Sequence, residues 1–185
     1  MEIVAASSPG ATFAQRHALW WSLQRSGQLN DAIAALKRLA ADNPNDPLVA
    51  LALGEAEYAE LGQIAQEGAP YNERAILALE ADQSFNTALN LDPTNWEAQF
   101  EKASALSHWP ASMNKNGEVI QRFSALVTQQ QSMPPEPEFA ATYLDLGNAY
   151  QAAGQPAKAA ETWQAGLTQF PLDSSLRQKL TDGTQ

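Results

Sequence analysis

The sequence GNAYQAAGQPAKAAETWQAGLTQFP, residues 147–171, places small and aromatic residues at regular offsets on both sides of a short turn. Positions three and four apart recur before the turn at residues 154–156 and again after it, which is the spacing of one face of an α-helix. Two amphipathic helices joined by so short a turn predict an antiparallel helical pair. The positions that set this pattern are Tyr143, Leu146, Gly147, Tyr150, Ala159, Trp163, Gly166 and Pro171.

This spacing resembles the tetratricopeptide repeat, whose pattern is W-x2-L-G-x2-Y, then A-x3-F, then P. The first helix matches over residues 143–150, and the second matches at Ala159-x3-Trp163. Small residues such as Gly147 let the two helices approach closely, and aromatic residues such as Trp163 fill the space between neighbouring pairs. Because one pair cannot bury its apolar face alone, the resemblance implies a stack of pairs.

The same offsets recur upstream, with two departures that change the expected packing. Trp20 stands where the pattern has glycine, so the helices of the first pair should be splayed or locally repacked. Gly54 and Ala81 are 27 positions apart, whereas the matching residues Gly147 and Ala159 are 12 apart. The second pair should therefore have elongated helices, each about two turns longer than usual, with the tip of the hairpin at residues 68–72.

The sequence therefore predicts an all-α fold, a right-handed α-solenoid of four tetratricopeptide helix pairs over residues 12–173. Capping signals are expected at Thr12 with Gln15, at Asp46, and at Thr94 with Glu97. A flexible lead-in precedes the solenoid at residues 1–11, and a short capping helix and tail follow at residues 174–185. The four pairs are expected at residues 13–46, 47–95, 96–134 and 140–173.

The composition excludes several classes of function. Lys and Arg number 11 against 21 Asp and Glu, a formal net charge of −10, so nucleic acid and anionic membrane surfaces are not expected partners. The absence of cysteine excludes disulfides and thiol catalysis. No apolar run is long enough for membrane insertion, and the first residues lack the pattern of a signal peptide.

The titratable residues do not form a recognisable catalytic motif. The two histidines, His17 and His108, lie far apart in the sequence and outside any metal-binding spacing. Glu55, Glu57 and Glu60 lie close together on one predicted helix, and we expect a solvated face without a raised pKa. We therefore predict a protein that is not an enzyme, with no catalytic residue, no metal and no cofactor.

In tetratricopeptide solenoids the first helix of each pair lines the concave face, so the resemblance implies a groove that binds a peptide or a helix. Aromatic residues exposed in a concavity suit such recognition. The alternative is that they pack against inserted segments or a neighbouring chain. The implied groove residues are His17, Trp21, Arg25, Leu51, Glu55, Tyr58, Phe100, Ser104, His108, Leu144 and Asn148.

Some members of the family hold a partner's C-terminal carboxylate with a clamp of lysine, asparagine and arginine side chains. The slots that match this clamp contain His17, Trp21, Ala52, Glu97 and Glu101. Two acids stand where bases are needed, so binding of acidic chaperone tails by this route is not expected.

The resulting hypothesis is a non-catalytic scaffold or adaptor of bacterial type that binds a protein or peptide partner. One alternative is a self-assembling module, a homodimer formed through the end of the solenoid near Trp20 and Trp21. Another is the interaction part of a larger enzyme or of an assembly-factor complex. The compartment is not predicted; it is cytoplasmic by default, or periplasmic if the chain is a fragment of an exported parent.

Overall fold

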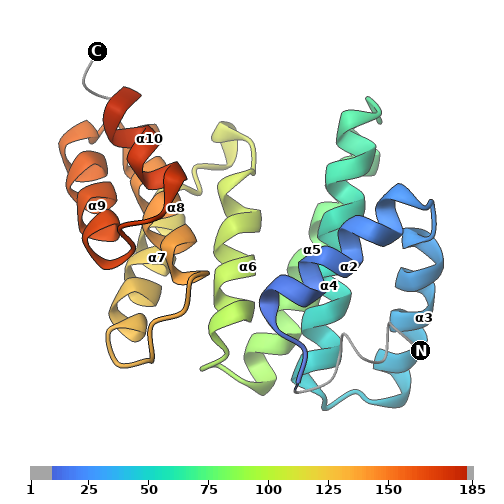
Figure 1. Ribbon diagram of the computed structural model, residues 1–185. Coiled ribbons are helices and arrows are strands. Elements are labelled where there is room, and N and C mark those ends of the chain that lie inside the picture. Colours follow the sequence, from blue (N-terminus) through green and yellow to red (C-terminus); the bar gives the residue numbers. More distant parts are fainter. Residues whose placement is uncertain (1–9, 183–185) are drawn as a thin grey trace. The chain divides into compact units, whose positions relative to one another are not determined.

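A computed structural model describes residues 10–182, which contain nine α-helices, one short 3₁₀ helix and no strand (Figure 1). This confirms the all-α prediction. Residues 1–9 of the expected lead-in and residues 183–185 of the expected tail lie outside the described part. The helices are α2 (Phe13–Arg25), α3 (Leu29–Asp42), α4 (Pro47–Gln66), α5 (Tyr71–Leu91), α6 (Trp96–Ser107), the 3₁₀ helix (Ala111–Met113), α7 (Asn116–Gln130), α8 (Phe139–Ala152), α9 (Pro156–Gln169) and α10 (Ser174–Asp182).

The described chain divides into two compact units, residues 10–105 and residues 106–182. The first unit contains α2 to α5 and nearly all of α6, and the second contains α7 to α10. The helices α6 and α7, which the sequence assigns to one pair, therefore fall in different units.

The helix starts follow from their capping residues. At α2 the Gln15 N–H donates to Thr12 Oγ1 at 3.2 Å and the Thr12 N–H donates to Gln15 Oε1 at 2.9 Å, so the predicted capping box is confirmed. The box predicted at Thr94 is wrong, because α6 begins one residue later. The Ala98 N–H donates to Asn95 Oδ1 at 2.9 Å, which leaves Glu97 outside the cap and available for a contact with α2.

The second pair is elongated, as predicted. Helix α4 has 20 residues and α5 has 21, whereas α8 and α9 have 14 each. Six or seven extra residues add about 10 Å of helix length. The turn at residues 67–70 joins the two helices, close to the tip expected from the sequence.

Glycine allows close approach between helices in both units. In the first unit, a Cβ at Gly54 would lie 2.7 Å from Phe85 Cδ1, so a side chain there would collide with the ring. In the second unit, a Cβ at Gly147 would overlap Trp163 Nε1, the atom that donates to the Leu144 carbonyl oxygen at 3.1 Å. The role that the sequence assigned to Gly147 is therefore confirmed.

Trp20, in the slot where the repeat has glycine, is 3% exposed and packs in the core of the first unit. The small residues Ala32 of α3 and Ala52 and Ala56 of α4 share its cluster. Alanine on the facing helices leaves space for the indole, which is the local repacking expected from the sequence.

Within residues 10–182, no helix combines the length and the apolarity needed to cross a membrane.

Candidate functional site

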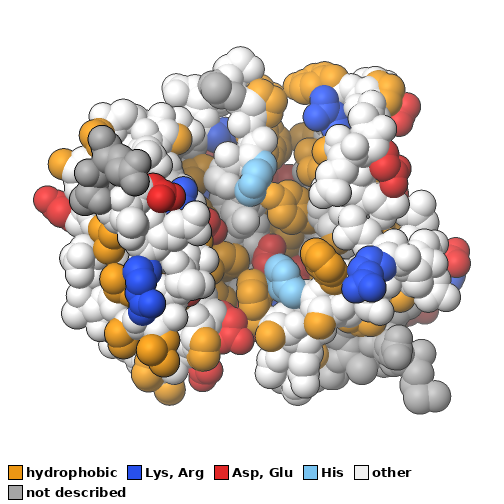
Figure 2. Space-filling view, turned by 45° about the horizontal axis from the view of Figure 1, so that its top comes forward, with side chains coloured by type: hydrophobic (Ala, Val, Ile, Leu, Met, Phe, Trp, Pro, Cys, Tyr) orange, Lys and Arg blue, Asp and Glu red, His pale blue; other side chains and the backbone are white. Residues whose placement is uncertain are grey.

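A cavity of about 270 Å³ opens in the first unit between α2, α4 and α6. Figure 2 shows hydrophobic and acidic side chains gathered near a histidine on the face that it draws. The wall combines four aromatic residues with two carboxylates and several neutral polar groups. The residues that define its character are His17, Trp20, Trp21, Glu55, Tyr58, Phe100, Glu101 and Ser104.

One side of the cavity rests on a buried ion pair between α2 and α4. Arg16 and Glu55 are each 3% exposed, and Arg16 Nε donates to both Glu55 oxygens at 3.0 Å. The guanidinium also donates to Glu97 of α6 and, from Nη1, to the Ala11 carbonyl oxygen at 2.9 Å. Trp20 Nε1 donates to Glu55 Oε2 at 2.9 Å. Arg16 is therefore fixed by partners from three parts of the unit.

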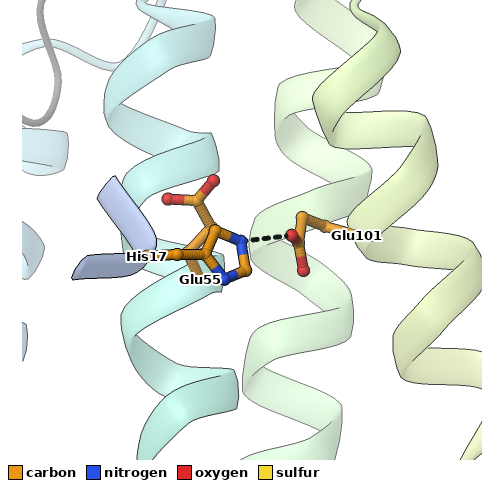
Figure 3. A group of neighbouring side chains, drawn as sticks. All are labelled: His17, Glu55 and Glu101. Carbon is orange, nitrogen blue, oxygen red and sulfur yellow. Dashed lines mark hydrogen bonds and ion pairs between the residues drawn. The ribbon is translucent and has the colours of Figure 1, made fainter. Parts of the chain in front are cut away.

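His17 lies beside Arg16 on α2 and reaches the opposite side of the cavity. Its Nε2 lies 2.8 Å from Glu101 Oε1 of α6. Figure 3 shows the imidazole between Glu55 and Glu101, with the hydrogen bond on the side of Glu101. The His17 side chain is 46% exposed and the Glu101 side chain only 4%. The histidine therefore covers a buried carboxylate while staying open to solvent itself.

Aromatic packing holds this histidine in place. The ring centroids of Phe13 and His17 are 4.2 Å apart, and those of Phe13 and Phe100 are 5.7 Å apart. Phe100 in turn stacks on Trp96 at 5.2 Å. These contacts join the first turns of α2 and α6, so the position of the imidazole depends on apolar packing as well as on its hydrogen bond.

The buried carboxylates change the acid–base behaviour of the cluster. Burial raises the pKa of Glu55 to about 7; the nearby charge of Glu101 adds to the rise, and Arg16 and the Trp20 hydrogen bond oppose it. Burial alone would lower the pKa of His17, but the hydrogen bond and charge of Glu101 outweigh it and raise that pKa. Near neutral pH these groups therefore exchange protons as a set.

The cluster is short of positive charge. Arg16 pairs with the carboxylates of Glu55 and Glu97, and His17 pairs with that of Glu101, so three carboxylates share two basic groups. His17 balances a second carboxylate only when it is protonated. Lys102, next to Glu101 in the sequence, instead pairs with Asp82 of α5. Buried negative charge without a counter-charge is costly, so the cluster favours a proton or another cation.

Residues 18–82 match the sequence model of the family described as Tetratricopeptide repeat. Over these residues the chain is similar to tetratricopeptide repeats. The match runs from within α2 to within α5, so it covers the repeats that supply two of the three walls of the cavity. A search of curated protein sequences found no match.

Solved structures share the tetratricopeptide-repeat fold at low sequence identity. TTC0263, a thermophilic tetratricopeptide-repeat protein of Thermus thermophilus, matches with a TM-score of 0.69 and 16% identity over 91% of this chain and 81% of its own. PilF of Pseudomonas aeruginosa matches with a TM-score of 0.67 and 17% identity, over 99% of this chain and 69% of its own. MamA of Desulfovibrio magneticus RS-1 matches with a TM-score of 0.64 and 23% identity, over 91% of this chain and 81% of its own. At these identities the similarity shows the fold alone.

Several residues that the repeat register selected lie together at the cavity. Trp21, Tyr58 and Ser104 line it together with His17, Glu55 and Phe100. Trp21 is 67% exposed at its edge. Arg25 is exposed one turn further along α2. The assignment of these residues to partner binding remains a prediction.

The repeat register was wrong for Leu51. This residue is 1% exposed and packs in the core around Phe85, with Ala98 and Ala105 of α6 in the same cluster. Helix α4 lies between other helices of the unit, so the face that should line a groove is partly covered here by α6. Leu51 is therefore not available to a partner.

Three predicted groove residues lie in the second unit. His108 follows α6 and is exposed. Leu144 of α8 packs against the buried core of that unit. Asn148, one turn further along α8, has a buried Oδ1 for which no hydrogen-bond partner exists among residues 10–182. These three residues are not assigned to the cavity of the first unit.

The solvated acidic face expected on α4 is also wrong. Glu55 and Glu57 are 3% and 2% exposed, and Glu60 is half-buried. Ser84 Oγ donates to Glu57 at 2.7 Å, and Lys37 Nζ lies 3.3 Å from the same carboxylate. Burial raises the pKa of Glu57, against the effect of these two contacts. The reason is that helices pack on both sides of α4, so its acids face neighbouring helices instead of water.

Sequence reasoning did not assign a role to Arg16, which organises the cluster. The signal was its position one turn before Trp20, on the face of α2 that also contains Leu23. A charged residue in register with buried ones implies a buried partner. The partner, Glu55, could not be chosen among the acids of α4 without the packing of the helices.

A metal ion was not expected from the sequence, yet the cluster contains ligand types that metals use. The ligand atoms of His17, Glu55 and Glu101 lie within 4.8 Å of one another. Both oxygens of Glu55 already accept from Arg16. A metal would have to displace this guanidinium or bind beside its positive charge, so the donor set suits a metal ion poorly.

Proposed function

We propose that the protein is a non-catalytic interaction module that binds a segment of a partner protein and seats one partner side chain in the cavity between α2, α4 and α6. The observation that carries this proposal is the cavity itself, with an exposed tryptophan at its edge and polar groups inside it. Exposed aromatic anchors beside a pocket are typical of residues that dominate binding energy in interfaces.

The size of the cavity supports a side chain as its occupant. Its volume of about 270 Å³ is below the range of about 300–1,000 Å³ that is usual for small-molecule sites. A single side chain that enters from a docked peptide fits this volume, while the rest of the peptide would lie outside.

The chemistry of the site supports binding over catalysis. The titratable groups at the cavity are engaged with one another, since His17 bonds to Glu101 and Arg16 holds Glu55.

The test blocks the cavity without disturbing the core. Gly62 of α4 lines the cavity, and a Cβ added there meets open space. Gly62→Gln therefore adds a side chain to the wall of the cavity at a position where its Cβ meets no neighbour. The matched control is Gly117→Gln on α7, which also has open space around it. Peptides selected from a random display library against the wild-type protein should lose binding to the Gly62 variant and keep it for the control.

Two results would refute the proposal: no peptide enriched from the library, or selected peptides that bind the Gly62 variant as well as the wild type. Sedimentation of the wild type over a range of concentrations separates self-association, which would also use the exposed Trp21, from capture of a different chain.

A further inference from the structure

We propose that the partner side chain seated in this cavity is basic, a lysine or an arginine, and that it pairs with Glu101. This inference rests on the proposed function and specifies its ligand.

The charge of the cluster is the first argument. Glu55 and Glu101 line the cavity, Glu97 pairs with Arg16 beside it, and the buried guanidinium of Arg16 opposes these three charges. A basic side chain supplies the missing positive charge, and it can do so while His17 is neutral. An acidic side chain would add a fourth carboxylate to the same low-dielectric site and would be repelled.

The second argument is the difference in freedom between the two basic groups already present. Arg16 is 3% exposed and has partners on α4, on α6 and in the backbone before α2. His17 is about half exposed and contacts Glu101 through one ring nitrogen. Figure 3 shows His17 Nε2 facing the carboxylate of Glu101, so a partner cation that binds Glu101 takes the place of this single hydrogen bond.

The third argument is the composition of the walls. Trp21, Tyr58 and Phe100 surround the approach to Glu101. Lysine and arginine pack their aliphatic stems on such surfaces while their charged heads seek a polar partner, and aromatic faces attract cations directly. A purely apolar side chain would fit the walls but would leave Glu101 buried without a counter-charge whenever His17 is neutral.

The net charge of the chain favours the same class of partner. A formal charge of −10 raises the encounter rate with basic segments and lowers it with acidic ones. This effect acts at long range and is screened by salt, whereas the contact with Glu101 is buried and is screened much less.

The experiment measures binding of fluorescein-labelled short peptide pools that differ in one fixed central residue: lysine, arginine, glutamine, leucine or glutamate. Anisotropy is recorded with EDTA present. Pools with lysine or arginine should bind about tenfold tighter than those with glutamine or leucine. Glu101→Gln should remove this preference. The matched control Glu161→Gln, which deletes an exposed charge on α9, should keep it.

Each other outcome is decisive. If leucine or glutamine pools bind best and Gly62→Gln abolishes their binding, the cavity binds peptides and the basic anchor is wrong. If no pool binds, the proposed function fails as well. Unchanged preference in a folded Glu101→Gln variant, verified by its circular dichroism, overturns the role of Glu101. A separate titration with Zn²⁺, without EDTA or peptide, tests whether the cluster binds a metal ion. The cluster is assigned to a metal instead if Zn²⁺ binds tightly, if both His17→Ala and Glu101→Gln abolish that binding, and if the peptide pools show no preference.

Discussion

The buried Glu55 carboxylate predicts that the protein loses stability as the pH rises from about 5 to about 8. The pKa of Glu55 is about 7 in the folded chain, against an ordinary value of 4.5. The folded state therefore holds a proton that the unfolded state has already released in this range. Proton binding to the folded state stabilises it below its folded pKa, and this contribution disappears as the pH passes through 7.

The magnitude follows from the size of the shift. Because Glu55 is 3% exposed, no discount for solvent is needed. A shift of this size, from 4.5 to about 7, corresponds to a loss of about 2–3 kcal/mol in the free energy of unfolding between about pH 5 and about pH 8. His17 acts in the same direction, since its pKa is raised and its stabilising proton is lost as the pH rises through that value.

The assay is urea unfolding followed by circular dichroism at a series of pH values in one buffer of constant ionic strength. The slope of stability against pH is compared between the wild type and Glu55→Gln, which has the same shape and cannot titrate. The slope should be markedly shallower in the variant, whatever its absolute stability, and Glu161→Gln should keep the wild-type slope. A wild-type stability that is flat or rises over this range, or an unchanged slope in Glu55→Gln, would refute the reasoning.

Three further predictions concern packing, the buried pair and binding. Gly147→Ala should destabilise the protein by about 1–3 kcal/mol, because the new Cβ overlaps Trp163. Gly62→Ala adds a Cβ in open space and should stabilise the protein by up to about 1 kcal/mol. Equal effects of the two variants in urea unfolding would contradict this prediction. Arg16→Met should lower the free energy of unfolding by about 3–5 kcal/mol, because it leaves Glu55 buried without its counter-charge. Adding Glu55→Leu to this variant should recover part of the lost stability. If the double variant instead lost the sum of the two single losses, Arg16 and Glu55 would not act as a pair. Peptides with a basic anchor should bind more tightly at about pH 8 than at about pH 5.5, since the raised pKa values of His17 and Glu55 mean that these groups lose competing protons over this range. Isothermal titration at both pH values would show the opposite trend if the anchor were acidic.

The parts of the fold that sequence predicted are those that depend on neighbours along the chain. The offsets around Gly147 and Trp163 specify which faces of α8 and α9 meet, and the longer spacing between Gly54 and Ala81 gives the elongated helices. At α6 the cap was predicted at Thr94, whereas the structure caps the helix with the next residue, Asn95. Which one starts the helix depends on one residue of register, and local pattern does not settle it.

The parts that sequence could not predict depend on which helices surround α4. Helical periodicity shows that Glu55 and Glu57 point in different directions, and it does not show that both directions are covered. Arg16 gave the same difficulty, because an arginine on a short helix is most often solvated. The prediction that Leu51 lines a peptide groove was wrong because residues of α6 pack in the same core cluster and cover it.

The contact between Arg16 and Glu97 has a consequence for how the first unit unfolds. It joins residues 81 positions apart, and so ties the first helix of the described chain directly to the fifth. In repeat proteins each repeat ordinarily contacts and stabilises only its neighbours along the chain, and the end repeats unfold first. Here α2, the first described helix, is held to a helix more than one pair away, so its amide protons should exchange together with those of α4 and α6. The unit should therefore lose its structure as a single cooperative block.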